Sequence, residues 1–205
     1  KSIALRREEL DVTEIRLFDI DKERQDKVAV VVDWILHEDL KCDIKLINTN
    51  DPETAYKDAS FIFAQMRVGK YAMREQDEKI PLRHGCVGQE TCGCGGMAYG
   101  MRTIFPMVKV IDDAEKYAKP DYWILNYSNP ASIVAEACRV LRPNARIINI
   151  CDMPIAIIDV VAAAMNIKDK KQIVYDYFGL NHFGWFTSIQ YQGKDMMPAL
   201  RQYIK

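Results

Sequence analysis

The chain has 205 residues, of which 49% are hydrophobic and 28% are charged, a balance typical of a globular protein with its own apolar core. Lys and Arg (28) against Asp and Glu (29) leave a formal net charge of −1, so a broad basic surface for nucleic acid is not expected. No apolar run reaches the roughly 20 residues that a membrane helix needs. We therefore expect a soluble protein that binds neither nucleic acid nor membrane.

The six cysteines follow no disulfide or zinc pattern. Cys92 and Cys94 flank Gly93 in a glycine-rich run, but the sequence lacks the second pair of Cys or His that a structural zinc site requires. A chain of this size buries enough apolar surface to fold without disulfides. Because residues 1–4 do not resemble a signal peptide either, we expect reduced thiols and a cytoplasmic protein.

Short β-branched runs alternate with longer helical patterns along the chain up to Ile150. Helices are expected at residues 22–37 and 131–141, with a short one opening at Asp51. The last two expected strands are almost wholly apolar, as in parallel sheets that helices cover on both faces. The pattern predicts the α/β class with a Rossmann-like, doubly wound parallel sheet. Its strands are expected at residues 14–19, 43–47, 60–64, 122–126 and 146–150.

Asp19 ends the first expected strand and is a candidate cofactor-binding residue. In a dinucleotide-binding sheet, an acidic residue at the end of the second strand binds the adenosine ribose hydroxyls and favours NAD over NADP. The alternative is that Asp19 caps the helix that follows it. No Gly-x-Gly-x-x-Gly turn precedes Glu14, and residues 1–10 are interpreted as the end of a helix. The first strand and its phosphate-binding loop are therefore expected upstream.

Two regions depart from the alternation of strands and helices. Residues 69–100 hold a cluster of glycines, and we expect a long irregular loop of functional importance there. After Ile173 the pattern changes to aromatic, strand-like runs, which indicate a second, α+β region. We predict a dinucleotide-binding domain over residues 1–172 and the start of a substrate-binding, catalytic domain over residues 173–205.

Polar residues follow apolar strands in four segments, at residues 67–74, 126–130, 149–154 and 179–185. Parallel α/β sheets bind their ligands at the carboxyl ends of their strands. Cys151 and Asp152 supply a thiolate and a carboxylate at one such end. Cys151 and His182 are candidate ligands for a divalent metal whose open positions could also coordinate substrate oxygens. The alternative is that His182 is a structural residue.

These segments together resemble the NAD- and metal-dependent glycoside hydrolases of family 4, and within that family the 6-phospho-α-glucosidase branch. The resemblance extends over essentially the whole chain in order and spacing. The matching motifs are Phe-Asp-Ile-Asp-Lys-Glu-Arg-Gln, Arg-Val-Gly-Lys-Tyr-Ala-Met-Arg, Val-Gly-Gln-Glu-Thr-Cys-Gly, Asn-Tyr-Ser-Asn-Pro, Cys-Asp-Met-Pro and Gly-Leu-Asn-His-Phe-Gly-Trp.

The resemblance implies roles for the catalytic and metal-binding positions. Cys151 and His182 match the metal ligands of the family, usually for Mn²⁺ or another divalent metal. Asp152 matches the proposed acid that protonates the departing glycosidic oxygen, and Glu90 matches a residue thought to raise the basicity of a catalytic tyrosine. That tyrosine, and an arginine that contacts the sugar phosphate, are expected beyond Lys205, so we expect residues 1–205 alone to be inactive.

The resemblance also implies which residues contact substrate and cofactor. Arg74 and Asn129 match substrate-binding positions, and Arg67 and Asn126 are placed with Asp19 at the cofactor. One departure from the family pattern is Cys94, which replaces the proline of a Cys-Gly-Pro-Gly-Gly loop and loosens that loop.

The resemblance implies hydrolysis of a phosphorylated disaccharide such as maltose 6-phosphate, by a homo-oligomer (a dimer or tetramer) in the cytoplasm. In this chemistry NAD transiently oxidises the third carbon of the sugar, the proton on the second carbon is removed, the leaving group is eliminated, and water adds. Two other functions stay open from the residues. A lactate- or malate-type NAD-dependent dehydrogenase has a motif similar to residues 126–130, but it would leave Cys151 and Asp152 without a role. A non-catalytic NAD-binding regulator would not require a thiolate beside a carboxylate.

Overall fold

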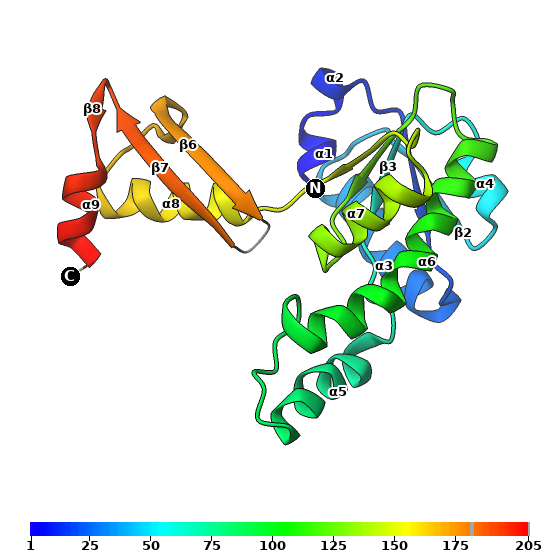
Figure 1. Cartoon of the computed structure of the whole chain (residues 1–205). Coiled ribbons are helices and arrows are strands. Elements are labelled where there is room, and N and C mark those ends of the chain that lie inside the picture. The colour runs from blue at the N-terminus through cyan, green and yellow to red at the C-terminus, as the bar shows by residue number, and fades with distance from the viewer. Residues whose placement is uncertain (181–182, 205) are drawn as a thin grey trace. The chain divides into compact units, whose positions relative to one another are not determined.

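The computed structural model describes residues 1–180 and 183–204. Helices and strands alternate along the chain, and the expected α/β class with parallel strand pairs is confirmed (Figure 1). The chain divides into two compact units, one formed by Lys1–Ile62 and Lys109–Trp123, the other by Phe63–Val108 and Ile124–Lys205. Among the described residues, no helix combines the length and the apolar character that a membrane crossing requires.

The first unit contains a parallel pair of strands in which Glu14 lies opposite Lys45. The second strand begins two residues later than expected, because Cys42 and Ile44 are buried against Ala4 and Leu36 before the strand starts. Its elements are α1 (Ser2–Leu5), α2 (Arg7–Leu10), β1 (Glu14–Phe18), α3 (Lys22–Asp33), the π-helical turn η1 (Trp34–Asp39), β2 (Lys45–Thr49) and α4 (Pro52–Tyr56).

A three-stranded sheet has the strand order β3–β4–β5, and β4 and β5 are parallel. The strands are β3 (Phe61–Ala64), β4 (Trp123–Asn126) and β5 (Ile147–Asn149). The helices that accompany them are α5 (Lys70–Arg83), α6 (Gly93–Tyr117), α7 (Ala131–Leu141) and α8 (Met153–Ala164).

The expectation of a long irregular loop over residues 69–100 is wrong. Helices α5 and α6 occupy most of that range and leave only residues 84–92 between them. Several of these glycines occur for a different reason than a loop: they lie where two backbones approach closely. A Cβ added at Gly88 would come within 2.0 Å of the Glu78 carbonyl oxygen on α5.

Residues after α8 form the aromatic strands that the sequence indicates. They comprise the short η2 (Lys170–Gln172), β6 (Ile173–Leu180), β7 (Phe183–Tyr191), β8 (Lys194–Asp195) and α9 (Met197–Ile204). Strands β6 and β7 are antiparallel, and α8 lies along this hairpin (Figure 1). Ile173 and Ile189 pack against Ile158 and Leu200 in a core of their own.

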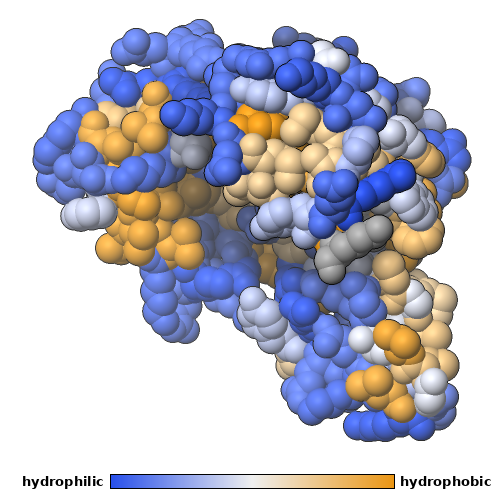
Figure 2. All heavy atoms as spheres, turned by 90° about the vertical axis from the view of Figure 1, so that its left-hand side faces the viewer, coloured by the Kyte–Doolittle hydropathy of each residue, from blue (hydrophilic) through white to orange (hydrophobic). Residues whose placement is uncertain are grey.

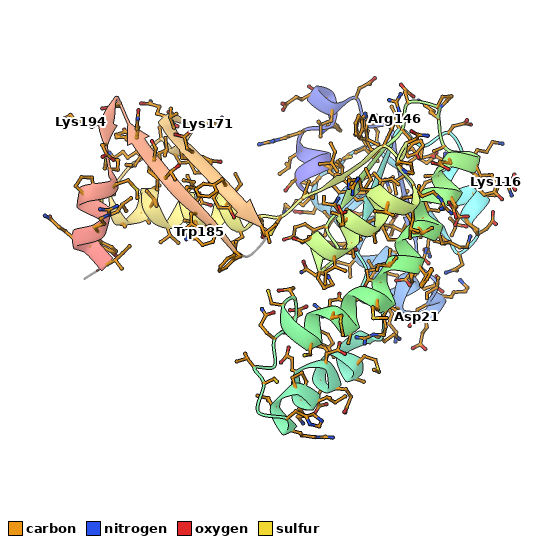
Figure 3. The ribbon with its side chains drawn as sticks, in the orientation of Figure 1. Asp21, Lys116, Arg146, Lys171, Trp185 and Lys194 are labelled. Carbon is orange, nitrogen blue, oxygen red and sulfur yellow. The ribbon has the colours of Figure 1, made fainter. Side chains whose placement is uncertain are left out.

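Strands β6 and β7 also carry exposed aromatic side chains, among them Phe178 and Trp185. The rings of Phe178 and Trp185 stack with their centroids 5.9 Å apart, and Figure 3 marks Trp185 on β7. On the face of the protein shown in Figure 2, hydrophobic side chains gather in separate patches within a mostly hydrophilic surface.

Gln25, on α3, joins the carboxyl ends of β1 and β2. Its side chain is 3% exposed, and its amide nitrogen donates to the carbonyl oxygens of Leu17 (2.6 Å) and Thr49 (2.8 Å). Its amide oxygen accepts from the backbone N–H of Asp19 at 2.9 Å and from the side chain of Asn50 at 2.6 Å. One buried amide therefore sets the level at which both strands end.

The interpretation of Asp19 as a helix cap is wrong, because the cap of α3 is Asp21 (Figure 3). The Asp21 side chain accepts from the backbone N–H of Arg24 at 3.2 Å. Asp19 instead accepts at Oδ1 from the backbone N–H of Asp21 (2.9 Å) and at Oδ2 from the Arg24 guanidinium (2.5 and 3.0 Å). Its carboxylate is thus held at the end of β1 by three donors.

Replacing Gln25 by Leu removes all four hydrogen bonds at the ends of β1 and β2. We expect the free energy of unfolding to fall by about 3 kcal/mol, because buried polar groups lose their partners. Lys27→Leu on the same helix changes a largely exposed side chain and should shift it by no more than about 0.5 kcal/mol. Urea unfolding midpoints measure both. Equal losses in the two variants would contradict this role for Gln25.

Candidate active site

Strands β4 and β5 end at the same level in the second unit. Asn126 and Asn149 are register partners, and the Asn126 side-chain amide donates to the Asn149 side-chain oxygen at 2.7 Å. The Asn126 side-chain oxygen accepts from the backbone N–H of Ser128 at 2.9 Å. Asn126 is fully buried and uses both ends of its amide within the protein. It therefore holds the start of the loop at residues 127–130, and its contact with a cofactor stays a prediction.

The loop after β3 is bound to the loop after β4. The backbone N–H of Met66 donates to the Ser128 hydroxyl at 3.0 Å, and the backbone N–H of Tyr127 donates to the Ala64 carbonyl at 2.8 Å. A further hydrogen bond joins the ends of β4 and β5: the backbone N–H of Ile150 donates to the Asn126 carbonyl oxygen at 2.9 Å. The segments after three neighbouring strands consequently leave the sheet together, where parallel α/β sheets bind ligands.

Cys151 and Asp152 leave the end of β5 at the start of α8. The Cys151 Sγ lies 4.0 Å from the Asp152 Oδ1, with the thiol half-buried and the carboxylate exposed. Asp152 occupies the N-cap position of α8, but its side chain makes no capping hydrogen bond. A thiol and a carboxylate thus lie side by side at the ligand-binding edge of the sheet.

Tyr127, which the sequence analysis did not single out, is the partner of Asp152. Its hydroxyl donates to the Asp152 carboxylate, and this bond, with some burial and the nearby negative charge, raises the pKa of Tyr127. The hydroxyl therefore stays protonated near neutral pH and remains a donor to Asp152. Its position directly after β4 could have indicated this contact, because β4 lies beside the parallel strand β5, which Asp152 follows.

Glu90, in the segment between α5 and α6, is held by two arginines. Its Oε1 accepts from the Arg67 Nη2 at 2.5 Å, and its Oε2 lies 3.3 Å from the Arg74 Nη2. Arg74 also donates from Nε to Glu78 at 2.8 Å, and this bond raises its pKa further above the usual arginine value. The structure thus brings together three of the residues that the sequence predicts for the site.

Aromatic rings and a second ion pair complete this cluster. The Arg67 guanidinium carbon lies 5.5 Å from the ring centroid of Tyr71 and 5.4 Å from that of Tyr99. Arg102 lies 5.9 Å from the Tyr99 ring and donates from both terminal nitrogens to the buried Asp77. Tyr99, Arg102 and Asp77 were missed from the sequence because they are spread over α5 and α6 and belong to none of its strand-end segments.

Close backbone contacts hold the segment that carries Glu90. A Cβ added at Gly95 would lie 2.6 Å from the Asp77 carbonyl oxygen and 2.7 Å from that of Gln89. These backbone atoms belong to α5 and to the residue next to Glu90, so only a glycine allows α6 to begin so close to both. The glycine-rich run is therefore part of the packing that positions Glu90.

Gly95→Ala is expected to destabilise the protein. In an unconstrained helix, alanine is about 1 kcal/mol more favourable than glycine, but here the new methyl group would overlap two backbone carbonyls. The neighbouring Cys94 is exposed, and Cys94→Ala should leave the melting temperature within about 2 °C. Thermal unfolding measures both variants. A Gly95→Ala variant more stable than the parent would contradict the close contact.

The remaining predicted site residues lie apart from these contacts or cannot be placed. Asp19 belongs to the first unit and is described with it. Asn129 is half-buried and precedes Pro130 through a cis peptide bond. His182 lies outside the described residues. Within the described ranges, no group of three or more His, Cys, Asp or Glu side chains is placed to hold a metal ion.

The donor chemistry of the described residues nevertheless fits the expected ligands. Cys151 offers a partly accessible sulfur beside a carboxylate, which suits a divalent transition metal when a further ligand joins it. Asp19 offers a carboxylate at the end of a parallel strand, which suits the hydroxyls of a ribose.

Comparison with known proteins assigns the family. The model of the family 4 glycosyl hydrolases matches residues 1–167, and that of the family 4 glycosyl hydrolase C-terminal domain matches residues 177–205. The chain therefore belongs to family 4 of the glycosyl hydrolases.

Similar proteins include 6-phospho-α-glucosidases. A maltose-6′-phosphate glucosidase of Bacillus subtilis (strain 168) is 53% identical over 198 residues, which are 96% of this chain and 44% of that protein. A crystal structure of a 6-phospho-α-glucosidase from gut microorganisms, in complex with NAD and glucose-6-phosphate, is 50% identical with a TM-score of 0.93, covering 98% of this chain and 45% of that one. A second such structure, in complex with NAD and Mn²⁺, is 43% identical with a TM-score of 0.93, covering 99% of this chain and 46% of that one. The chain thus spans less than half the length of these three relatives.

More distant matches include a member of the same family and a protein that shares only the fold. A 6-phospho-β-glucosidase of Escherichia coli (strain K12) is 35% identical over 194 residues, which are 94% of this chain and 43% of that protein. A lactate dehydrogenase from Eimeria maxima is 12% identical with a TM-score of 0.64, covering 100% of this chain and 57% of that one. That last likeness shows the Rossmann-type fold alone.

Proposed function

We propose that the whole protein to which this chain belongs hydrolyses 6-phospho-α-glucosides, such as maltose 6-phosphate, with NAD and a divalent metal as cofactors. The observation that carries the proposal is the placement of Cys151 and Asp152 side by side directly after β5, next to the end of its parallel neighbour β4, in a chain of this family. Relatives and solved structures named 6-phospho-α-glucosidase at 43–54% identity support the substrate class.

Each site residue has a role in this proposal. Cys151, with His182, would hold the metal, and Asp19, Arg67 and Asn126 would serve the cofactor. Arg74 and Asn129 would bind the sugar phosphate substrate. When bound, NAD would accept a hydride from the sugar and return it, and the metal would act as a Lewis acid on the sugar oxygens.

Asp152 would act as the general acid that protonates the departing glycosidic oxygen. Its carboxyl group is exposed and makes no helix-capping bond, so it is accessible to a substrate. The hydroxyl of Tyr127 is a hydrogen-bond partner of the same carboxyl group. Glu90 would act on the site through its charge, which Arg67 and Arg74 compensate.

The substrate anomer is argued from the motif that contains Asp152. Cys-Asp-Met-Pro is the form associated with the α-glucoside branch, whereas the phospho-β-glucosidases resemble Cys-Asn-x-Pro. The lower identity to a named 6-phospho-β-glucosidase agrees with this choice. Sugar phosphates of this kind arise during phosphorylating import into the cytoplasm, where we place the protein as a homo-oligomer (a dimer or tetramer).

A lactate- or malate-type dehydrogenase is the weaker alternative. Its support is a likeness in fold at 12% identity, and it gives the thiol of Cys151 no role. The two functions differ in a measurable product, because a dehydrogenase accumulates NADH whereas the proposed hydrolase regenerates NAD in each turnover.

Hydrolysis by the whole protein should require both NAD and a divalent metal, without net formation of NADH. After removal of nucleotide and dialysis against a chelator, activity on maltose 6-phosphate is expected to fall at least 100-fold and to return on adding NAD and Mn²⁺ together. Absorbance at 340 nm should stay constant during turnover. Full activity in the stripped protein would contradict the cofactor assignment.

Cys151→Ser should weaken metal binding, because the alcohol is a poorer ligand than a thiolate for a transition metal. We expect at least a tenfold rise in the Mn²⁺ concentration that gives half-maximal activity. The exposed Cys92, replaced by Ser, is the matched control and should keep the parent value. Unchanged Mn²⁺ dependence in Cys151→Ser would remove this residue from the metal site.

The whole protein should prefer α-linked phosphorylated glucosides. We expect kcat/KM for maltose 6-phosphate to exceed that for maltose and for cellobiose 6-phosphate by at least 100-fold each. β-Linked substrates with good leaving groups can still react, since the reaction proceeds through an activated C–H bond. Faster cleavage of cellobiose 6-phosphate than of maltose 6-phosphate would place the protein in the other branch.

A further inference from the structure

Tyr99 is a buried residue of α6 that none of the proposed roles uses. It is 3% exposed, and its ring lies 5.4 Å from the guanidinium carbon of Arg67 and 5.9 Å from that of Arg102. A single ring is therefore shared by the two arginines that bind the acidic residues Glu90 and Asp77.

The two arginines differ in how firmly hydrogen bonds hold them. Arg102 donates from both terminal nitrogens to the Asp77 carboxylate, which fixes its orientation. Arg67 reaches Glu90 through Nη2 alone, at 2.5 Å. Its Nη1 is buried and has no hydrogen-bond partner among the described residues. A single hydrogen-bonded nitrogen leaves the guanidinium able to pivot, so the orientation of Arg67 depends also on contacts other than hydrogen bonds.

Aromatic rings supply those contacts. Tyr71 covers Arg67 at 5.5 Å, but Tyr71 is 75% exposed, where water weakens a cation–π interaction. Tyr99 is shielded from water, so its attraction for the guanidinium is the stronger of the two. Its hydroxyl contributes little, since its contact with the Met66 carbonyl oxygen is 3.5 Å long.

We propose that Tyr99 is a positioning residue of the active site: its ring holds Arg67 against Glu90 and thereby fixes the orientation of Glu90 beside Arg74. The proposal rests on the proposed function, because it assigns Glu90 and Arg74 to that reaction. Tyr99 touches neither acid itself and acts through Arg67. Without the ring, Arg67 is free to leave Glu90, which would then keep Arg74 as its one partner among the contacts described here.

Three substitutions in the whole protein test this role. They distinguish the effect of the Tyr99 ring from that of its hydroxyl, and the effect of the buried Tyr99 ring from that of the exposed Tyr71 ring. With maltose 6-phosphate, NAD and Mn²⁺, Tyr99→Leu should lower kcat/KM roughly 10- to 30-fold, the range of a desolvated cation–π contact. Tyr99→Phe keeps the ring and should stay within about twofold of the parent. Tyr71→Leu removes the exposed ring and should cost no more than about fivefold. An equal loss in Tyr99→Phe and Tyr99→Leu, or a larger loss in Tyr71→Leu, would overturn the proposal.

A double variant tests whether Tyr99 acts through Glu90. If it does, Tyr99→Leu combined with Glu90→Gln should be no more than about threefold slower than Glu90→Gln alone. Independent effects would multiply, and a full product of the two losses would overturn the proposal. Should Tyr99→Leu fail to fold, Tyr99→Met fills the same space with a flexible apolar chain and replaces it throughout.

A structural measurement keeps this proposal distinct from the proposed function. A crystal structure of the Tyr99→Leu protein without ligands should show Arg67 displaced from Glu90 and Arg102 still paired with Asp77. An unchanged pair of Arg67 and Glu90 would overturn the proposal whatever the activity. If the parent protein does not cleave maltose 6-phosphate, the proposed function fails, and this structure still decides whether Tyr99 positions Arg67.

Discussion

The hydrogen bond between the side chains of Asn126 and Asn149 is the constraint on which the arrangement of the site depends. Both residues end parallel strands, and the Asn126 side-chain nitrogen donates to the Asn149 side-chain oxygen at 2.7 Å. Asn126 is fully buried. An amide that lost this partner would leave polar groups buried without hydrogen bonds, which is costly. The two strands therefore end together, and the residues that follow them, Tyr127 on one side and Cys151 with Asp152 on the other, are brought to a common edge.

The charge of Glu90 is compensated by a series of neighbouring ion pairs. Acidic and basic side chains alternate from Glu78 through Arg74 and Glu90 to Arg67, so no charge in this series is isolated. Tyr99 extends the series to Arg102 through its ring rather than through a hydrogen bond. In such a network the cations that compensate the carboxylates are already in place before a substrate displaces water.

The glycine-rich run shows how one composition supports two interpretations. The cluster of glycines in residues 69–100 suggests a long irregular loop, yet most of that segment is helical. Gly88 and Gly95 lie there because backbone carbonyls of α5 and of the connecting segment leave no room for a Cβ. These glycines therefore mark close packing of backbones, which only the neighbouring backbone reveals.

The sequence by itself determined the α/β class, most of the strands, and the residues at their carboxyl ends, among them Asp19, Asn126, Cys151 and Asp152. Hydrophobic periodicity and the ends of apolar runs are local properties, so they can be read along the chain. Only the tertiary structure decided which of these residues meet, and it added Tyr127 and Tyr99. Their partners Asp152 and Arg67 are 25 and 32 residues distant in the sequence and lie outside the elements of the two tyrosines. Such contacts depend on strand register and helix packing, which no local pattern encodes.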